Sequence, residues 1–167
     1  MAGLISELIG NINEQSEVYD SLLELAGKKK VAVIANDIEK LQSIVDEENV
    51  LLGRIGRLDK SRVQLFKDIA FVLNKKDEDI SLNKLMDLIK GQSEENELRK
   101  AKEELFDKAG RLKTLNEQNQ KLIEYSLEHI DFSMNVIRSA LSNKPSYCDA
   151  MGNELSDSSQ RMFDTKQ

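Results

Sequence analysis

The chain has 167 residues, enough for one domain with its own hydrophobic core. Charged residues make up 32% of it and aromatic residues 5%, a balance typical of long helices with much exposed surface. The formal net charge of −6 argues against a nucleic-acid-binding protein, because contacts to phosphates need a basic face. The basic run Lys28-Lys29-Lys30 is typical of a solvated helix end.

Several features bear on the compartment in which the protein works. Cys148 is the single cysteine, so no disulfide can form within the chain and a reducing compartment is expected. The first residues include Glu7 and lack the basic lead and cleavage site of a secretory signal. Apolar runs stay well below the roughly 20 residues that a membrane-spanning helix needs. We therefore expect a soluble, cytoplasmic protein that does not insert into a membrane.

Hydrophobic spacing, together with the residues that start and stop helices, predicts four helices. They cover residues 2–35, 37–73, 81–90 and 93–141. Gly27 interrupts the first helix as a weak point rather than as an end. Asn36 is expected to cap the second helix while Glu39 reaches back to it, and Ser81 to cap the short third helix.

The second helix has a wide apolar face, about three positions in every seven, which favours packing against two neighbours. Glu48, Asp59 and Arg62 interrupt this face, and we interpret them as rim or ion-paired residues. The predicted fold is all-α: an elongated antiparallel helical bundle or coiled coil of three long helices and one short helix. This bundle is expected over residues 1–141, followed by a mobile C-terminal tail over 142–167.

The last helix is predicted to be longer than its partners. At ~1.5 Å per residue it would span roughly 70 Å, against roughly 50 to 55 Å for each of the first two helices. Part of it must therefore extend past its neighbours, bend, or find another partner. This mismatch predicts an apolar stripe that is free to bind another molecule.

The sequence shows no pattern typical of an enzyme, so we expect no catalytic residues, no metal and no cofactor. His129 is the single histidine and lies beside acidic residues, whereas a metal site needs three or four converging ligands. Ser126 lies three residues before His129, but no glycine turn is near enough to supply an oxyanion hole.

Two asparagines lie close together among leucines on the last helix. Asn119 falls in the helix seam, where a buried asparagine can fix the register of neighbouring helices. A second interpretation is that Asn116 and Asn119 bind the backbone of a helix or extended peptide. Tyr147, in the tail, is either incidental or an interface anchor, since aromatic residues are favoured in buried interfaces.

These residues resemble a known family. The segment Leu115–Asn119 matches the Leu-Asn-x-x-Asn pattern of the FlgN family of flagellar type III export chaperones, and the apolar pair Leu122-Ile123 follows it. The segment Tyr147–Asn153 resembles the tyrosine and glycine turn that the family has behind its long helix. The resemblance covers essentially the whole chain; Cys148 and a longer serine-rich tail depart from it.

The resemblance implies a non-enzymatic chaperone that binds the terminal amphipathic segments of the hook–filament junction proteins FlgK and FlgL. It also implies delivery of these clients to the export gate, through the cytoplasmic domain of FlhA, with Tyr147 as the contact. We expect the client to bind the distal half of the last helix. The expected client-binding residues are Asn116, Asn119, Leu122, Ile123, Leu127, Ile130, Met134, Ile137 and Leu141.

Two other functions are compatible with the same pattern. One is a coiled-coil scaffold, possible as a homodimer, in which a second copy covers the stripe from Ile123 to Leu141. The other is a helical adaptor of another secretion or signalling system, with the same fold and a different client. A dimer that buries the stripe would favour the scaffold.

Overall fold

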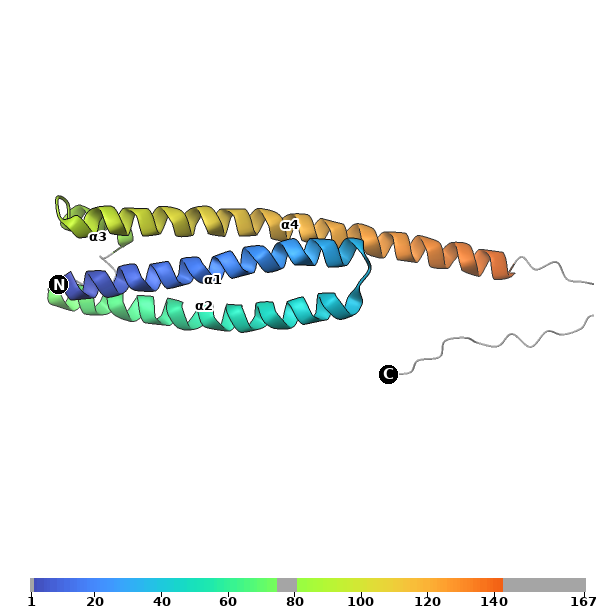
Figure 1. Ribbon diagram of the computed structural model, residues 1–167, viewed down its shortest axis with the longest axis horizontal. Coiled ribbons are helices and arrows are strands. Elements are labelled where there is room, and N and C mark those ends of the chain that lie inside the picture. The colour runs from blue at the N-terminus through green and yellow to red at the C-terminus, as the bar shows by residue number, and fades with distance from the viewer. Residues whose placement is uncertain (1, 75–80, 143–167) are drawn as a thin grey trace, which may run out of the picture. The chain divides into compact units, whose positions relative to one another are not determined.

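A computed structural model describes residues 2–74 and 81–142, which form four α-helices (Figure 1). The helices are α1 (Ala2–Ile34), α2 (Ile38–Val72), α3 (Leu82–Leu88) and α4 (Ser93–Ser142). The predicted all-α class is confirmed, and each helix ends within about two residues of its expected position. Contacts within the chain divide it into two units, Met1–Glu128 and His129–Gln167. The expected boundary between a bundle and a tail at residue 141 stays a prediction.

A tight turn joins α1 to α2, and the two helices run antiparallel (Figure 1). Asn36 has a left-handed backbone, with φ of 51°, which an asparagine tolerates better than most residues. The N–H of Asp37 donates to the carbonyl of Ala32 at 3.0 Å, so this turn closes the end of α1. Asp37 then caps α2, because its carboxylate accepts from the N–H of Lys40 at 3.0 Å. The expectation that Asn36 caps α2 is wrong.

Replacing Asp37 with Ala is expected to lower the free energy of unfolding by about 0.5 to 2 kcal/mol. The change leaves the N–H of Lys40 without its side-chain acceptor at a helix start. Urea unfolding followed by far-UV circular dichroism measures the loss. Asp37→Ser keeps a capping oxygen and serves as the control, which should stay close to the wild type. Equal losses in both variants would contradict the cap.

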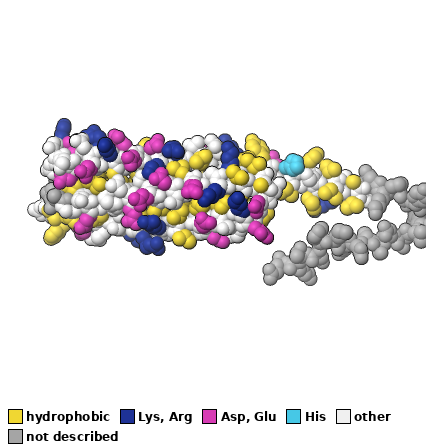
Figure 2. Space-filling model, in the orientation of Figure 1, with side chains coloured by type: hydrophobic (Ala, Val, Ile, Leu, Met, Phe, Trp, Pro, Cys, Tyr) yellow, Lys and Arg dark blue, Asp and Glu magenta, His cyan; other side chains and the backbone are white. Residues whose placement is uncertain are grey.

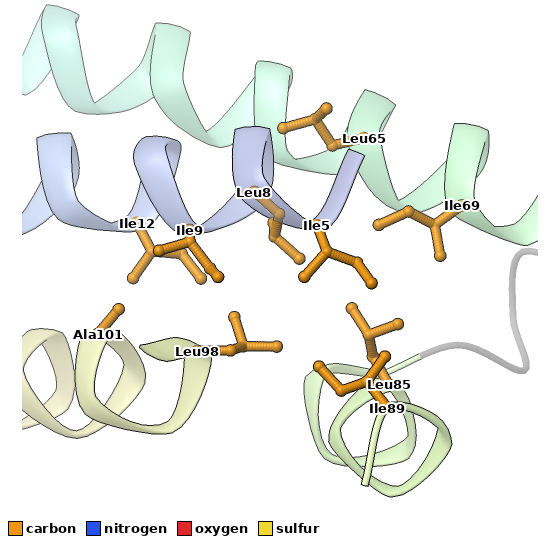
Figure 3. Close-up of a cluster of buried hydrophobic side chains, with 10 residues drawn as sticks. All are labelled: Ile5, Leu8, Ile9, Ile12, Leu65, Ile69, Leu85, Ile89, Leu98 and Ala101. Carbon is orange, nitrogen blue, oxygen red and sulfur yellow. The ribbon is translucent and has the colours of Figure 1, made fainter. Parts of the chain in front are cut away.

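The main hydrophobic core lies near the start of α1, where all four helices contribute side chains (Figure 3). Its buried residues are Ile5, Leu8, Ile9, Ile12, Leu65, Ile69, Leu85, Ile89, Leu98 and Ala101. Burying each large side chain is worth about 1.5 to 3 kcal/mol. The short helix α3 packs into this core through Leu85 and through Ile89, which directly follows α3, and Lys102 on α4 donates to Asn83 on α3 at 2.6 Å.

A layer of polar side chains lies between α1 and α2 beyond this core. Asn11 donates to the carbonyl of Leu58 at 3.1 Å, and Gln15 donates to Asp59 at 3.3 Å. Arg62 forms an ion pair with Asp59 at 2.9 Å and donates to Gln15 at 3.3 Å. The interpretation of Asp59 and Arg62 as paired residues is therefore confirmed. Because each partner is satisfied only in one alignment, the layer fixes the register of the two helices.

The turn from α3 to α4 uses a glycine and a carboxylate. Ser81 caps α3 as expected, accepting from the N–H of Lys84, and Gly91 takes a φ of 86°, which favours glycine. The N–H of Gly91 donates to Glu95 at 2.8 Å. This bond, with the hydrogen bond from Arg99, holds the pKa of Glu95 below its ordinary value. The carboxylate thus stays charged at the start of α4, where the helix dipole favours a negative charge.

Candidate functional site

The C-terminal part of α4 carries large apolar side chains that no described residue covers. Five of them recur at steps of three and four, which places them on one side of the helix. We call this set the distal stripe; it consists of Leu127, Ile130, Met134, Ile137 and Leu141. The exposed fractions are 56% for Leu127 and 38% for Met134. Figure 2 shows hydrophobic side chains gathered on this part of α4.

Other sides of the same segment are apolar as well. Tyr125, Phe132 and Val136 are also exposed, so hydrophobic surface extends beyond the distal stripe. Contiguous apolar surface of this kind marks an interaction site in soluble proteins. This part of α4 therefore has the composition of a surface that another molecule covers.

The expected site residues nearer the middle of α4 are less exposed. Leu122 and Ile123 are half-buried, while Asn116 is exposed. Thus the nine residues expected on α4 differ in environment: five lie in the distal stripe, and four lie where α4 packs on α1. The structure describes no residue beyond 142, so Tyr147 lies outside the described residues.

Asn119 is buried, with 2% of its surface exposed. Its side-chain amide donates to the carbonyl of Ala26 on α1 at 2.8 Å, which fixes α4 against α1 at this point. This contact supports the interpretation of Asn119 as a residue that sets helix register. The other side-chain atom, Oδ1, is also buried and has no hydrogen-bond partner among the described residues. An unpaired buried acceptor costs free energy, so this position lowers the stability of the fold while its amide holds α4 against α1.

Two cavities lie between α2 and α4 and are also lined by α1; both belong to the unit Met1–Glu128. One, of about 580 Å³, ends at Tyr19 on α1, Ile55 on α2 and Ala109 on α4. The other, of about 460 Å³, begins at Leu22, Leu52 and Leu112 on the same three helices. On each helix the two cavities are three residues apart, about one helical turn. They therefore form consecutive parts of one groove, which we call the α2–α4 groove.

Asn116, Asn119 and Ile123 line the second part of this groove. These three residues were expected in the client surface, whereas the groove walls on α2 were not expected. The wall residues Ile55, Val63 and Phe66 lie on α2, for which the sequence predicted only a wide apolar face. The width of the apolar face of α2 could have indicated these walls, because a helix that packs against two neighbours can leave a gap beside a third helix.

Among residues 2–74 and 81–142, no group of three or more His, Cys, Asp or Glu side chains could hold a metal ion. His129 is exposed. The search of the described helices for a segment long and apolar enough to cross a membrane found none.

Comparison with known protein families gives a match. A family model described as FlgN protein matches residues 1–153. Neither the curated proteins nor the solved structures contain a match to the chain. The matched range includes all four helices, and therefore both the α2–α4 groove and the distal stripe.

Proposed function

Because the chain belongs to the FlgN family of flagellar export chaperones, we propose that its clients are the hook–filament junction proteins FlgK and FlgL. The chaperone binds their terminal segments, which form amphipathic helices once the flagellum is assembled. While bound, a segment cannot pair with another subunit, so the client does not assemble before export. The protein carries out this role in the cytoplasm.

The observation that carries the proposal is the uncovered distal stripe on α4. An amphipathic segment has one apolar face, and it gains stability by laying this face on an apolar surface of another helix. Leu127, Ile130 and Met134 offer such a surface at helical spacing. Ordering a flexible client offsets part of the contact energy, so we expect a moderate affinity that allows release.

Release takes place at the membrane, where the chaperone passes its client to the export gate. We propose that Tyr147 contacts the cytoplasmic domain of FlhA, the gate protein. Tyr147 follows α4 in the sequence and lies outside the described residues, so this contact is assigned from the family pattern alone. Separate sites for client and gate would let the chaperone hold the client until the gate has bound.

Calorimetric titration of the full chain with the C-terminal segment of FlgK from the same organism tests the proposal. We expect saturable one-to-one binding by the wild type and equally by a Tyr147→Ala variant, which should lose only affinity for the FlhA domain. No binding of the segment by either protein would contradict the chaperone proposal. Sedimentation would then show whether a second copy covers the distal stripe, as a scaffold requires.

A further inference from the structure

The C-terminal part of α4 is apolar on two nearly opposite sides, and the distal stripe occupies one of them. The other, which we call the second side, consists of Tyr125, Phe132 and Val136, spaced by seven and four residues. At about 100° per residue, the mean directions of the two sets differ by roughly 160°. Phe132 is 68% exposed. A helix laid on the distal stripe leaves the second side uncovered, so this side needs a cover of its own.

The chain continues from the end of this surface. α4 ends at Ser142, and residues 143–167 follow it, outside the described residues. Asn143 to Ser146 include Pro145, which stops a helix, and have the length of a connection between antiparallel helices. From Ser142 back to Tyr125 is a path of roughly 26 Å along α4. The rest of the chain is long enough to cover this path even as a helix, which would span about 30 Å.

The spacing of apolar residues in this part of the chain mirrors that of the second side. Met151, Leu155 and Met162 are spaced by four and seven residues, the reverse of the order on α4. Because antiparallel helices meet in reverse order, a single alignment pairs the two sets. The pairs are Met151 with Val136, Leu155 with Phe132, and Met162 with Tyr125. A methionine sulfur beside an aromatic ring adds to the gain from apolar burial.

Charge favours the second side over the distal stripe, whose spacing such a segment would also fit. Arg161 lies on one flank of the apolar side formed by Met151, Leu155 and Met162. In the antiparallel alignment, the exposed Glu128 lies on the facing flank of the second side. On the distal stripe, the same flank of α4 carries Ser126 and Ser133, which have no charge. The pair of opposite charges is therefore available only on the second side.

We propose that residues 147–163 of this chain pack as an antiparallel helix on the second side of α4, with Arg161 beside Glu128, and leave the distal stripe free. The C-terminal tail, expected to be mobile, is then docked for most of its length. Attachment to α4 gives this segment a high effective concentration, so a modest contact suffices to hold it. Tyr147 would lie beside the end of α4, off the distal stripe.

The chain has no tryptophan, so one introduced indole reports its own surroundings by fluorescence. Phe132→Trp places the reporter on the second side, and Met134→Trp places it on the distal stripe. Each full-length reporter is compared with and without Met151→Glu plus Leu155→Glu. We expect these two changes to shift the emission of the Phe132→Trp reporter to longer wavelengths, because the undocked segment exposes the indole to water. The Met134→Trp reporter should not respond.

The matched control is Asn153→Glu with Ser156→Glu, which adds the same charge to the segment at positions off its apolar side. It should leave both reporters unchanged. A shift of the Met134→Trp reporter alone would place the segment on the distal stripe and overturn the inference, as would the absence of any shift. The measurement needs no client, so its failure leaves the chaperone proposal intact.

The alignment has its own test, because Cys148 is the single cysteine and Cys148→Ser gives a cysteine-free chain. In that chain, Tyr125→Cys with Met162→Cys is expected to form a disulfide within one molecule at least about tenfold faster than Leu127→Cys with Met162→Cys. Both pairs are oxidised under the same conditions and followed on non-reducing gels. Equal rates would overturn the alignment, and bridges between two molecules would show that a second copy covers the second side.

Discussion

Replacing Leu127 and Met134 with Asp is expected to weaken binding of the FlgK segment at least about a hundredfold, a loss of about 2.7 kcal/mol of binding free energy. Both side chains are exposed in the free protein, so the carboxylates stay hydrated there. In the complex the same carboxylates would be buried against the apolar face of the client without partners, which is costly. Calorimetry with the client peptide measures the loss.

The same double variant should keep the helical far-UV circular dichroism of the wild type. The matched control is Asn135→Asp with Ser139→Asp, which adds the same charge at exposed positions of α4 that lie off the distal stripe. This control is expected to bind the peptide like the wild type. Unfolding of the Leu127 and Met134 variant would show that the stripe is core. Full binding by the folded variant would remove the stripe from the client site.

The helices could be predicted from the sequence because their signals are local. Apolar residues at steps of three and four define each helix, and Ser81 and Gly91 mark two of the ends by their own backbone and side-chain chemistry. The error at Asn36 has the same origin. A capping residue and a left-handed residue that ends the previous helix use the same residue types, so adjacent Asn36 and Asp37 could not be told apart.

The groove could not be predicted, because it depends on the distance between two helices that meet only through a third. Tyr19, Ile55 and Leu105 each belong to an apolar face, and their spacing shows that these faces pack inward. It does not show whether the faces of α2 and α4 meet each other or leave a gap. That outcome depends on how α1, α3 and the polar layer at Gln15 hold the other helices.

The distal stripe could be predicted from the sequence in part. The length of the last helix and its apolar spacing predicted side chains without an internal partner, and Ile130 and Ile137 are exposed. The pattern that identifies such residues is the same as that of a core, so only the absence of a facing helix distinguishes them. The unequal helix lengths supplied that information from the sequence.

Two substitutions of Asn119 are expected to change the free energy of unfolding by very different amounts. Asn119→Asp should lower the free energy of unfolding by about 3 kcal/mol or more at neutral pH, because a buried carboxylate cannot donate to the Ala26 carbonyl and repels it. Asn119→Leu should change it by less than about 1 kcal/mol. The Leu variant loses one hydrogen bond but also removes the unpaired Oδ1, and the Ala26 carbonyl lies within α1, whose own ladder supplies an N–H.

The pH dependence of the Asp variant separates charge from shape. Burial raises the folded-state pKa of the new carboxyl above the unfolded value of about 3.9, so the folded state favours its protonated form. The deficit relative to wild type is therefore full at neutral pH, shrinks as pH falls through the folded pKa, and is smallest below about pH 4. Urea unfolding of both variants at a series of pH values measures it. A deficit that does not change with pH would mean that the position tolerates charge and rejects only the altered hydrogen bonding.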